Sequence, residues 1–266
     1  MATVGRGMPS ARWAPAFEMW WLLYLRTWKG NLISRFLLPV LFLVSMGVVL
    51  GDLVDERTGG VGGVPYLQFV VPGILAAQAM WSAMSESTYS VTGAIRWNMG
   101  YHAMLATPLG VGDVLLGHLL YVTVSVSMAT VVFVLVGALF GAWVSWWVVA
   151  AVPVVVLTGM AFSVPCFALS AMLRDNVELG YTVLFRFVMT PLFLFSGTFF
   201  PVDQLPAVLQ PVAWVTPLWH GVEVSRDLAL GAPDWGAVAL HTAYLVLLVM
   251  LSSVWALRAF RRRLVV

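Results

Sequence analysis

Long apolar stretches separated by short polar ones dominate the pattern along this chain. A hydrocarbon core of ~30 Å requires about 20 consecutive, mostly apolar residues in a helix that crosses it. Six stretches meet this requirement, near residues 31–51, 67–90, 113–140, 145–172, 179–199 and 236–257. The sequence therefore predicts an all-α integral membrane protein with six transmembrane helices.

The segment before the first of these stretches mixes aromatic and charged side chains. Trp20, Trp21, Tyr24 and Trp28 have amphipathic rings, which favour the depth of the lipid headgroups. We expect residues 1–29 to form a cytosolic tail and an interfacial helix, and residues 30–266 to form one transmembrane domain. The alternative is that this segment extends the first membrane span.

The helical pattern breaks down between the fifth and sixth predicted spans. Ser196-Gly197 interrupts the fifth span, and prolines follow at positions 201, 206, 211 and 217. Proline removes a backbone donor and clashes with the preceding turn, so these residues exclude one continuous helix. Irregular backbone at membrane depth persists only where protein or a water-filled cavity covers it. The sequence predicts a re-entrant helical hairpin over residues 198–235, with the shape of a gate or lid.

Composition supports a membrane location, and the distribution of charge predicts the orientation. The chain is 61% hydrophobic and 10% charged, against about 25% charged residues in soluble domains. One side of the predicted topology carries only Arg57 and Arg226. By the positive-inside rule, both termini are then cytosolic. The cytosolic side carries Arg6, Arg12, Arg26, Lys29, Arg35, Arg96, Arg174, Arg258, Arg261, Arg262 and Arg263.

Several kinds of chemistry are excluded. The single cysteine, Cys166, permits neither a disulfide framework nor a cysteine metal site. Lys29 is the only lysine and is followed by Gly30, so the chain has no phosphate-binding P-loop. The four histidines show no metal-ligand spacing. We expect no cofactor or metal in this chain and no nucleic-acid partner, and energy must come from a gradient or another subunit.

Polar side chains recur at helical spacing in the second and fifth predicted spans. Spacings of three and four residues place each set on one helical face. A charge at the bilayer centre costs about 2.5–3.5 kcal/mol, so each buried charge requires a partner or water. One hypothesis pairs Glu86 with Arg186, within one chain or across a dimer; the alternatives are snorkelling to headgroups and a purely structural role. We predict that the two sets line a translocation path, namely Gln78, Ser82, Glu86 and Tyr89, and Thr182, Arg186, Thr190 and Phe193.

The segment between the second and third spans, residues 91–112, has few charges for a cytosolic loop. Its side chains are suited to docking on a soluble partner, and the alternative is an amphipathic turn that lies on the membrane surface. The candidate docking residues are Tyr101, Leu105, Thr107 and Pro108. The C-terminal arginines are interpreted as an anchor that binds anionic headgroups.

Three stretches together resemble the permease subunits of ABC-2 type exporters, in particular those for nodulation factors (lipo-oligosaccharides) and for daunorubicin resistance. They are Tyr66–Gly73, Met104–Leu109 and Phe195–Pro201, the last followed by Leu205-Pro206, Pro217-Leu218, His220, Glu223 and Arg226. The resemblance covers most of the chain.

This resemblance implies two permease copies with two cytosolic ABC ATPase subunits, which hold the ATP–Mg, in a bacterial plasma membrane. It implies that residues 91–112 couple the ATPase to the bundle and that the second and fifth helices line the path. We expect Phe199 and Phe200 to form a hydrophobic gate with Phe193; ordinary packing is the alternative. The sparse polar stripe favours an amphipathic cargo, a glycolipid or a hydrophobic drug.

Other classes of function have less support in the sequence. A proton-coupled transporter requires a carboxylate near the bilayer midplane, for which Glu86 is the only candidate, and the sequence shows no inverted repeat. An intramembrane enzyme requires converging nucleophiles, acids or histidines, which this sequence does not group. A membrane scaffold for a soluble ATPase also remains open.

Overall fold

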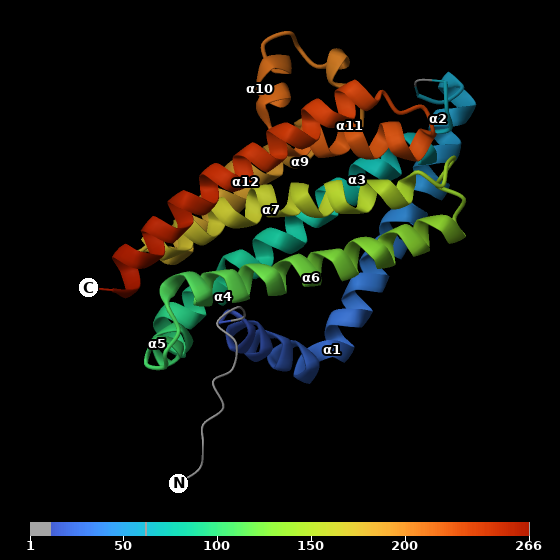
Figure 1. The fold of residues 1–266 in the computed structure, drawn as a ribbon. Helices are drawn as coiled ribbons and strands as arrows, with labels where there is room; N and C mark the ends of the chain where they lie inside the picture. The colour runs from blue at the N-terminus through green and yellow to red at the C-terminus, as the bar shows by residue number, and fades with distance from the viewer. Residues whose placement is uncertain (1–11, 62, 266) are drawn as a thin grey trace.

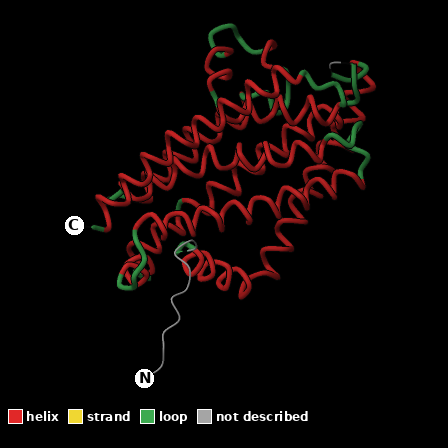
Figure 2. Tube along the Cα trace, viewed as in Figure 1, coloured by secondary structure: helices red, strands yellow, loops and turns green. Residues whose placement is uncertain are grey.

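The structure, a computed structural model, describes residues 12–61 and 63–265; the side chains of residues 31, 32, 34–36, 38, 39, 47, 48 and 58 are outside the described set. Within these residues every regular secondary-structure element is a helix, and the only β-pairing is an isolated bridge between Val61 and Val64. Figure 2 shows this all-helical composition. The predicted fold class, an all-α integral membrane protein, is confirmed at this level.

Five helical stretches among the described residues are long and apolar enough to cross a membrane, namely Tyr66–Trp97, Val111–Leu139, Val148–Met172, Val177–Phe195 and Trp235–Leu264. They correspond to the second through sixth predicted spans. The first stretch consists of α3 (Tyr66–Ser87), α4 (Tyr89–Thr92) and the π-helix η2 (Gly93–Trp97). The next two are α6 (Val111–Leu139) and α7 (Val148–Met172), and the last is α12 (Trp235–Leu264).

The stretch that corresponds to the fifth predicted span is divided into α8 (Val177–Val183), the π-helix η3 (Leu184–Met189) and α9 (Thr190–Phe195). It ends at Phe195, four residues before the predicted boundary. Ser196–Phe200 form bends instead, because Gly197 adopts the left-handed conformation, with φ of 79°.

The beginning of the described chain forms one continuous helical stretch. α1 (Ala14–Phe42) continues through the π-helix η1 (Leu43–Val49) into α2 (Leu50–Thr58). The backbone continuity does not distinguish an interfacial helix over residues 13–29 from an extension of the first span, so the interfacial helix stays a prediction. Figure 1 shows that α1 changes direction, so that its first part lies beside the first half of α6 and its second part crosses α6 toward α2. The predicted span 31–51 is helical, but many of its side chains are outside the described residues and it is not among the five stretches above.

The two ends of the bundle carry different elements (Figure 1). α5 (Gly100–Leu105) and the last turn of α12 lie at one end, whereas α2 and α10 (Gln210–Val215) lie at the other. We call these the α5 end and the α10 end.

The prediction that no single continuous helix joins the fifth and sixth predicted spans is confirmed. After the bends come the 3-10 helix η4 (Val202–Gln204), α10 and α11 (Pro217–Leu230). Proline stands in the first turn of both α10 and α11, where its missing donor is tolerated. α11 packs against α3 and α7, so this segment is part of the helical bundle rather than a free loop.

Candidate functional site

The polar stripe of α3 faces α6. Gln78, Ser82 and Glu86 are half-buried, and the Gln78 side chain donates a hydrogen bond to Ser82 Oγ at 3.5 Å. Ser125 of α6 donates its hydroxyl to Glu86 Oε1 at 3.3 Å. The fourth member of the stripe, Tyr89, is exposed.

The polar stripe of the helical stretch that corresponds to the fifth predicted span is exposed in the single chain. Thr182, Arg186 and Thr190 are exposed, and Arg186 lies in the π-helical turn of η3. Thr190 Oγ1 donates to the Phe185 carbonyl at 2.9 Å. In the 18-residue apolar segment that identifies this stretch as a possible span, only 17% is buried inside the chain, against 72% in the stretch that contains α3. This face is therefore available to a second chain, lipid or cargo.

Glu86 and Arg186 do not meet within one chain, so that form of the predicted pairing is wrong. Glu86 is directed toward Ser125 of α6, whereas Arg186 lies on the exposed face of η3. The side of α3 that packs against the fifth stretch is apolar, with Met80 and Met84 in one cluster with Met189. A pair across a dimer remains a prediction.

The α5 end of the two predicted path helices is joined by a hydroxyl network that the sequence reasoning missed. The buried Tyr181 hydroxyl of α8 lies 2.6 Å from Thr92 Oγ1 and 2.9 Å from the Thr88 carbonyl. It also lies 2.8 Å from Ser170 Oγ of α7, which donates to the Ser87 carbonyl at 3.0 Å. We call this the Tyr181 network; it connects the stretches that correspond to the second, fourth and fifth predicted spans.

The α10 end is joined by a second network around Arg226 of α11. Its guanidinium donates to the Gly197 carbonyl at 2.7 Å, to the Phe69 carbonyl at 3.3 Å and to Glu223 Oε1 at 3.1 Å. It also lies 4.0 Å above the centre of the Phe69 ring. We call this the Arg226 network; the sequence analysis used Arg226 as a topological charge and as part of the family resemblance, and predicted none of these contacts.

Burial is the largest influence on the ionisation of both charged partners in the Arg226 network. It raises the pKa of Glu223 and lowers the pKa of Arg226, while the charge of each partner acts in the opposite direction on the other. The ion pair thus offsets part of the cost of burying Arg226, which is 8% exposed.

In the same region, the backbone of α3 lies very close to the backbone of the bend that follows α9. A Cβ added to Gly73 of α3 would lie 2.6 Å from the Thr198 carbonyl oxygen, so only glycine allows this contact. Ser196 Oγ lies 2.9 Å from Thr216 Oγ1, the cap that accepts a hydrogen bond from the Trp219 amide. The bend after α9 is therefore fixed to α3 on one side and to α11 on the other.

The three predicted gate phenylalanines divide into two groups. Phe193 and Phe199 meet edge to face, with ring centres 5.0 Å apart, and Phe193 also contacts Trp81 of α3 at 6.3 Å. Phe200 packs instead in a small cluster with Val202 and Leu205 beside α10. The structure brings together only two of the three.

The segment 91–112 is helical at its centre, and Tyr101 of α5 is fully buried, so its side chain is not on the exposed surface of this segment. Docking of the segment on a soluble partner stays a prediction. The Tyr101 hydroxyl lies 2.6 Å from Nδ1 of His118 in α6. Thr107 and Pro108 are exposed and Leu105 is half-buried. Thr107, Pro108 and Leu109 border a cavity of about 530 Å³ at the start of α1, whose other walls are Arg12 and Pro15.

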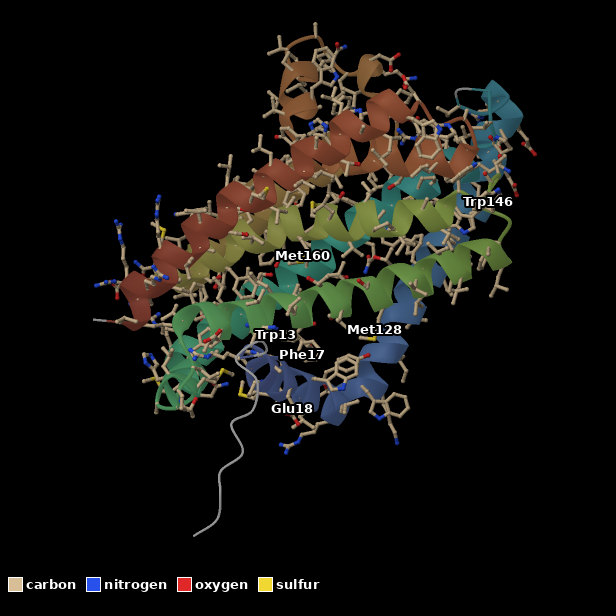
Figure 3. All side chains as sticks on the ribbon, in the orientation of Figure 1. Trp13, Phe17, Glu18, Met128, Trp146 and Met160 are labelled. Atoms are coloured by element: carbon tan, nitrogen blue, oxygen red, sulfur yellow. The ribbon has the colours of Figure 1, made fainter. Side chains whose placement is uncertain are left out.

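The first part of α1 packs into the bundle through the same residues. Trp20 is buried and stacks on His118, with ring centres 3.7 Å apart. Figure 3 shows Trp13 and Phe17 between α1 and α6, with Glu18 on the opposite side of α1. Trp20, His118 and Tyr101 therefore connect α1, α6 and α5 in one aromatic cluster, which the sequence did not reveal.

Two histidines that the sequence analysis treated as scattered meet at the α10 end. Nδ1 of His220 in α11 lies 2.6 Å from Nδ1 of His241 in α12, so one ring donates and the other accepts. Burial lowers the pKa of His220 to about 4, and the charge of His241 acts in the same direction. In the described part of the chain, no group of three or more His, Cys, Asp or Glu residues is placed to hold a metal ion.

A cavity of about 480 Å³ opens between the two predicted path helices at the α5 end. Its walls combine aromatic and polar side chains that can contact both parts of an amphipathic molecule, including Tyr89, Arg96, Trp97, Asn176 and Glu178.

These features are those of a multi-spanning membrane protein in which the stretches that correspond to the second and fifth predicted spans are joined at both ends. Residues 18–230 match the family of ABC-2 type transporters, and the chain belongs to this family. It is an ABC transporter permease, and membership in this family implies partnership with an ABC ATPase subunit.

Curated relatives agree with this assignment. The chain is 31% identical over 256 residues to Nodulation protein J of Rhizobium leguminosarum bv. viciae, covering 96% of this chain and 94% of that protein. It is 32% identical over 257 residues to Nodulation protein J of Rhizobium meliloti (strain 1021), covering 96% and 93%. It is also 27% identical over 234 residues to the inner membrane transport permease YadH of Escherichia coli (strain K12), covering 86% and 85%.

Proposed function

We propose that this chain is the membrane half of an ATP-driven exporter, in which separate cytosolic ABC ATPase subunits bind and hydrolyse ATP–Mg. The observation that carries the proposal is the exposed Thr107-Pro108 loop, which lies beside the start of α1 and directly follows α5. A partner that presses on this loop would move α5, whose Tyr101 contacts His118 of α6. Motion at the surface would then reach the spanning helices through packed side chains.

The α5 end is proposed to face the cytosol of a bacterium, with both termini on that side. Arginines cluster at this end, as the positive-inside rule requires, namely Arg96, Arg174, Arg258, Arg261, Arg262 and Arg263. The bends after Phe195 together with α10 and α11 would then form a re-entrant segment at the outer side of a six-span domain over residues 30–266.

Two identical permease chains with two ATPase subunits are the proposed assembly. The open face of α8–η3–α9 supports this, because it leaves Thr182, Arg186 and Thr190 exposed in the single chain. We propose that the path runs between the two copies, and that Arg186 of one copy reaches Glu86 of the other. Glu86→Gln and Arg186→Met, alone and combined, test this contact: transport defects that simply add in the double variant would exclude it.

The proposed cargo is amphipathic, a glycolipid of the lipo-oligosaccharide type or a hydrophobic drug. The cavity beside Tyr89 and Trp97 supports this class, since rings can stack on sugar or apolar groups while Arg96 and Glu178 bind polar ones. Phe193 and Phe199 would close the outer part of the path. A Phe199→Ala protein with unchanged transport and unchanged basal ATP hydrolysis would remove Phe199 from the gate.

ATP dependence distinguishes this proposal from a proton-coupled carrier based on Glu86. In inverted membrane vesicles that contain the chain and its ATPase, we expect uptake of a fluorescent amphipathic probe to require ATP and to persist after an uncoupler collapses the proton gradient. Loss of uptake with the uncoupler, while ATP remains, would favour the carrier instead.

A further inference from the structure

The C-terminal ends of α7 and α12 form a basic cavity at the α5 end. Its volume is about 410 Å³, and four guanidinium groups line it, those of Arg174, Arg258, Arg262 and Arg263. Trp255 and Met172 form apolar walls of the same cavity. None of its lining residues is acidic.

The arrangement is more specific than a row of positive charges that orients a helix. Trp255, Arg258 and Arg262 are spaced at intervals of three and four, which places them on one face of α12. Arg261, in the same helical turn, does not line the cavity. Arg174 comes from the loop that follows α7, so two separate parts of the chain contribute arginines to one cavity.

The cavity has an excess of positive charge that calls for an anion. Arg263 lies near enough to Arg174 and Arg96 for their charges to oppose its own, and Asp175 is the acidic neighbour that acts on it. Arg96 is fixed in this region by donating a hydrogen bond to the Arg174 carbonyl. Like charges gathered in this way repel unless a counter-ion binds between them.

We propose that this cavity binds the phosphodiester of an anionic phospholipid in the leaflet at the α5 end. A guanidinium group binds phosphate oxygens with paired hydrogen bonds. The acyl chains would lie along α12, because only 11% of its 18-residue apolar segment is buried inside the chain. Leu251 and Trp255, which precede the arginines on this helix, are exposed. A soluble anion or an acidic surface of the ATPase would use the arginines but not this apolar face.

Lipid selectivity of the purified full-length chain tests the proposal. The chain is exchanged into detergent with equal amounts of phosphatidylglycerol and phosphatidylethanolamine of the same acyl composition, and bound lipid is measured by native mass spectrometry. We expect about tenfold more bound phosphatidylglycerol, because each arginine near an anionic headgroup adds to the affinity. Equal binding of the two lipids by the unaltered chain would overturn the proposal without any variant.

Variants locate the site. Arg258→Gln with Arg262→Gln is expected to reduce the preference to near unity, whereas Arg261→Gln, one helical turn or less away but outside the cavity, leaves it unchanged. Arg258→Lys with Arg262→Lys retains the charge and serves if the glutamine variant fails to fold. A preference unaltered by the glutamine pair, or equally reduced by Arg261→Gln, would overturn the assignment.

Two further measurements separate the possible anions. Inorganic phosphate at the same concentration as the lipid is expected not to displace phosphatidylglycerol, and displacement would indicate a site for free phosphate. Weaker co-purification of the ATPase with the glutamine pair, at unchanged lipid preference, would assign the cavity to protein contact and overturn the lipid proposal.

Discussion

Arg226 of α11 donates a hydrogen bond of 2.7 Å to the carbonyl of Gly197, the left-handed residue at which the fifth spanning stretch bends. The same guanidinium reaches the Phe69 carbonyl near the start of α3. One side chain therefore fixes three elements at the α10 end. At the opposite end, Tyr181 joins α8 to α3–α4 and α7. The two predicted path helices are thus connected near both ends and packed through apolar side chains between them.

Replacement of Arg226 by methionine is predicted to destabilise the fold by about 3 kcal/mol, because it removes charge-assisted hydrogen bonds from two buried carbonyls and leaves Glu223 without its cation. Thermal unfolding in detergent, followed by tryptophan fluorescence, measures the loss. Arg57→Met, an exposed arginine of α2 at the same end, is the matched control and should change the midpoint little. Equal effects of the two substitutions would contradict a special role for Arg226.

Gly73→Ala is predicted to destabilise the protein by about 1–3 kcal/mol, since the new Cβ would lie 2.6 Å from the Thr198 carbonyl oxygen. Gly30→Ala is the control, because no neighbouring atom lies within 4 Å of its Cβ position in α1. There alanine should be neutral or stabilising by about 0.5–1 kcal/mol, through its helix propensity. Opposite signs of the two shifts in unfolding midpoint are the expected result; a harmless Gly73→Ala would show that α3 and the bend are not in close contact.

Tyr181→Phe retains the ring but removes the hydroxyl at the centre of the Tyr181 network. We expect a cost of about 1–3 kcal/mol, because the buried groups on α4 and α7 lose a shared partner. Tyr89→Phe, at an exposed ring that contacts Tyr181 edge to face, should cost much less. The unfolding midpoints of both variants in one detergent provide the comparison, and similar losses would argue against the network.

Tyr101→Phe is predicted to weaken coupling between ATP hydrolysis and transport more than it weakens the fold, because it breaks the contact between α5 and His118 of α6. The measurement is the amount of probe transported per ATP hydrolysed in vesicles. Trp20→Leu, which removes the ring stacked on His118, should act in the same direction. Trp28→Leu, an exposed tryptophan of the same helix, should leave the ratio unchanged. A ratio that is unaltered in Tyr101→Phe would exclude this route.

The sequence predicted the features that depend on local composition. Five of the six predicted spans correspond to described helical stretches that are long and apolar enough to cross a membrane, because length and apolar content determine which segments favour the membrane. The interruption after Phe195 was predicted from glycine and proline, whose backbone constraints are local. The family was also predicted, from motifs that retain their order along the chain.

Contacts between distant segments were not predicted. Tyr181 lies 93 residues from Thr88, and His220 and His241 lie on different helices, so no local periodicity could pair them. The expected partnership of Glu86 and Arg186 failed within one chain because both spacing patterns fix a face but not its rotation about the bundle. Tyr101 was predicted to be a docking residue because its segment has few charges for a cytosolic loop, yet its ring is fully buried in the bundle.

The measurement that tests the account most directly is purification of this chain co-expressed with a candidate ABC ATPase subunit from the same organism, followed by mass determination and ATP hydrolysis in lipid. We predict a stable complex of two permeases and two ATPase subunits that hydrolyses ATP, and that loses the ATPase when Thr107 and Pro108 are replaced by aspartate. If no ATPase associates with the folded permease, the proposed coupling surface and ATP-driven export are both contradicted.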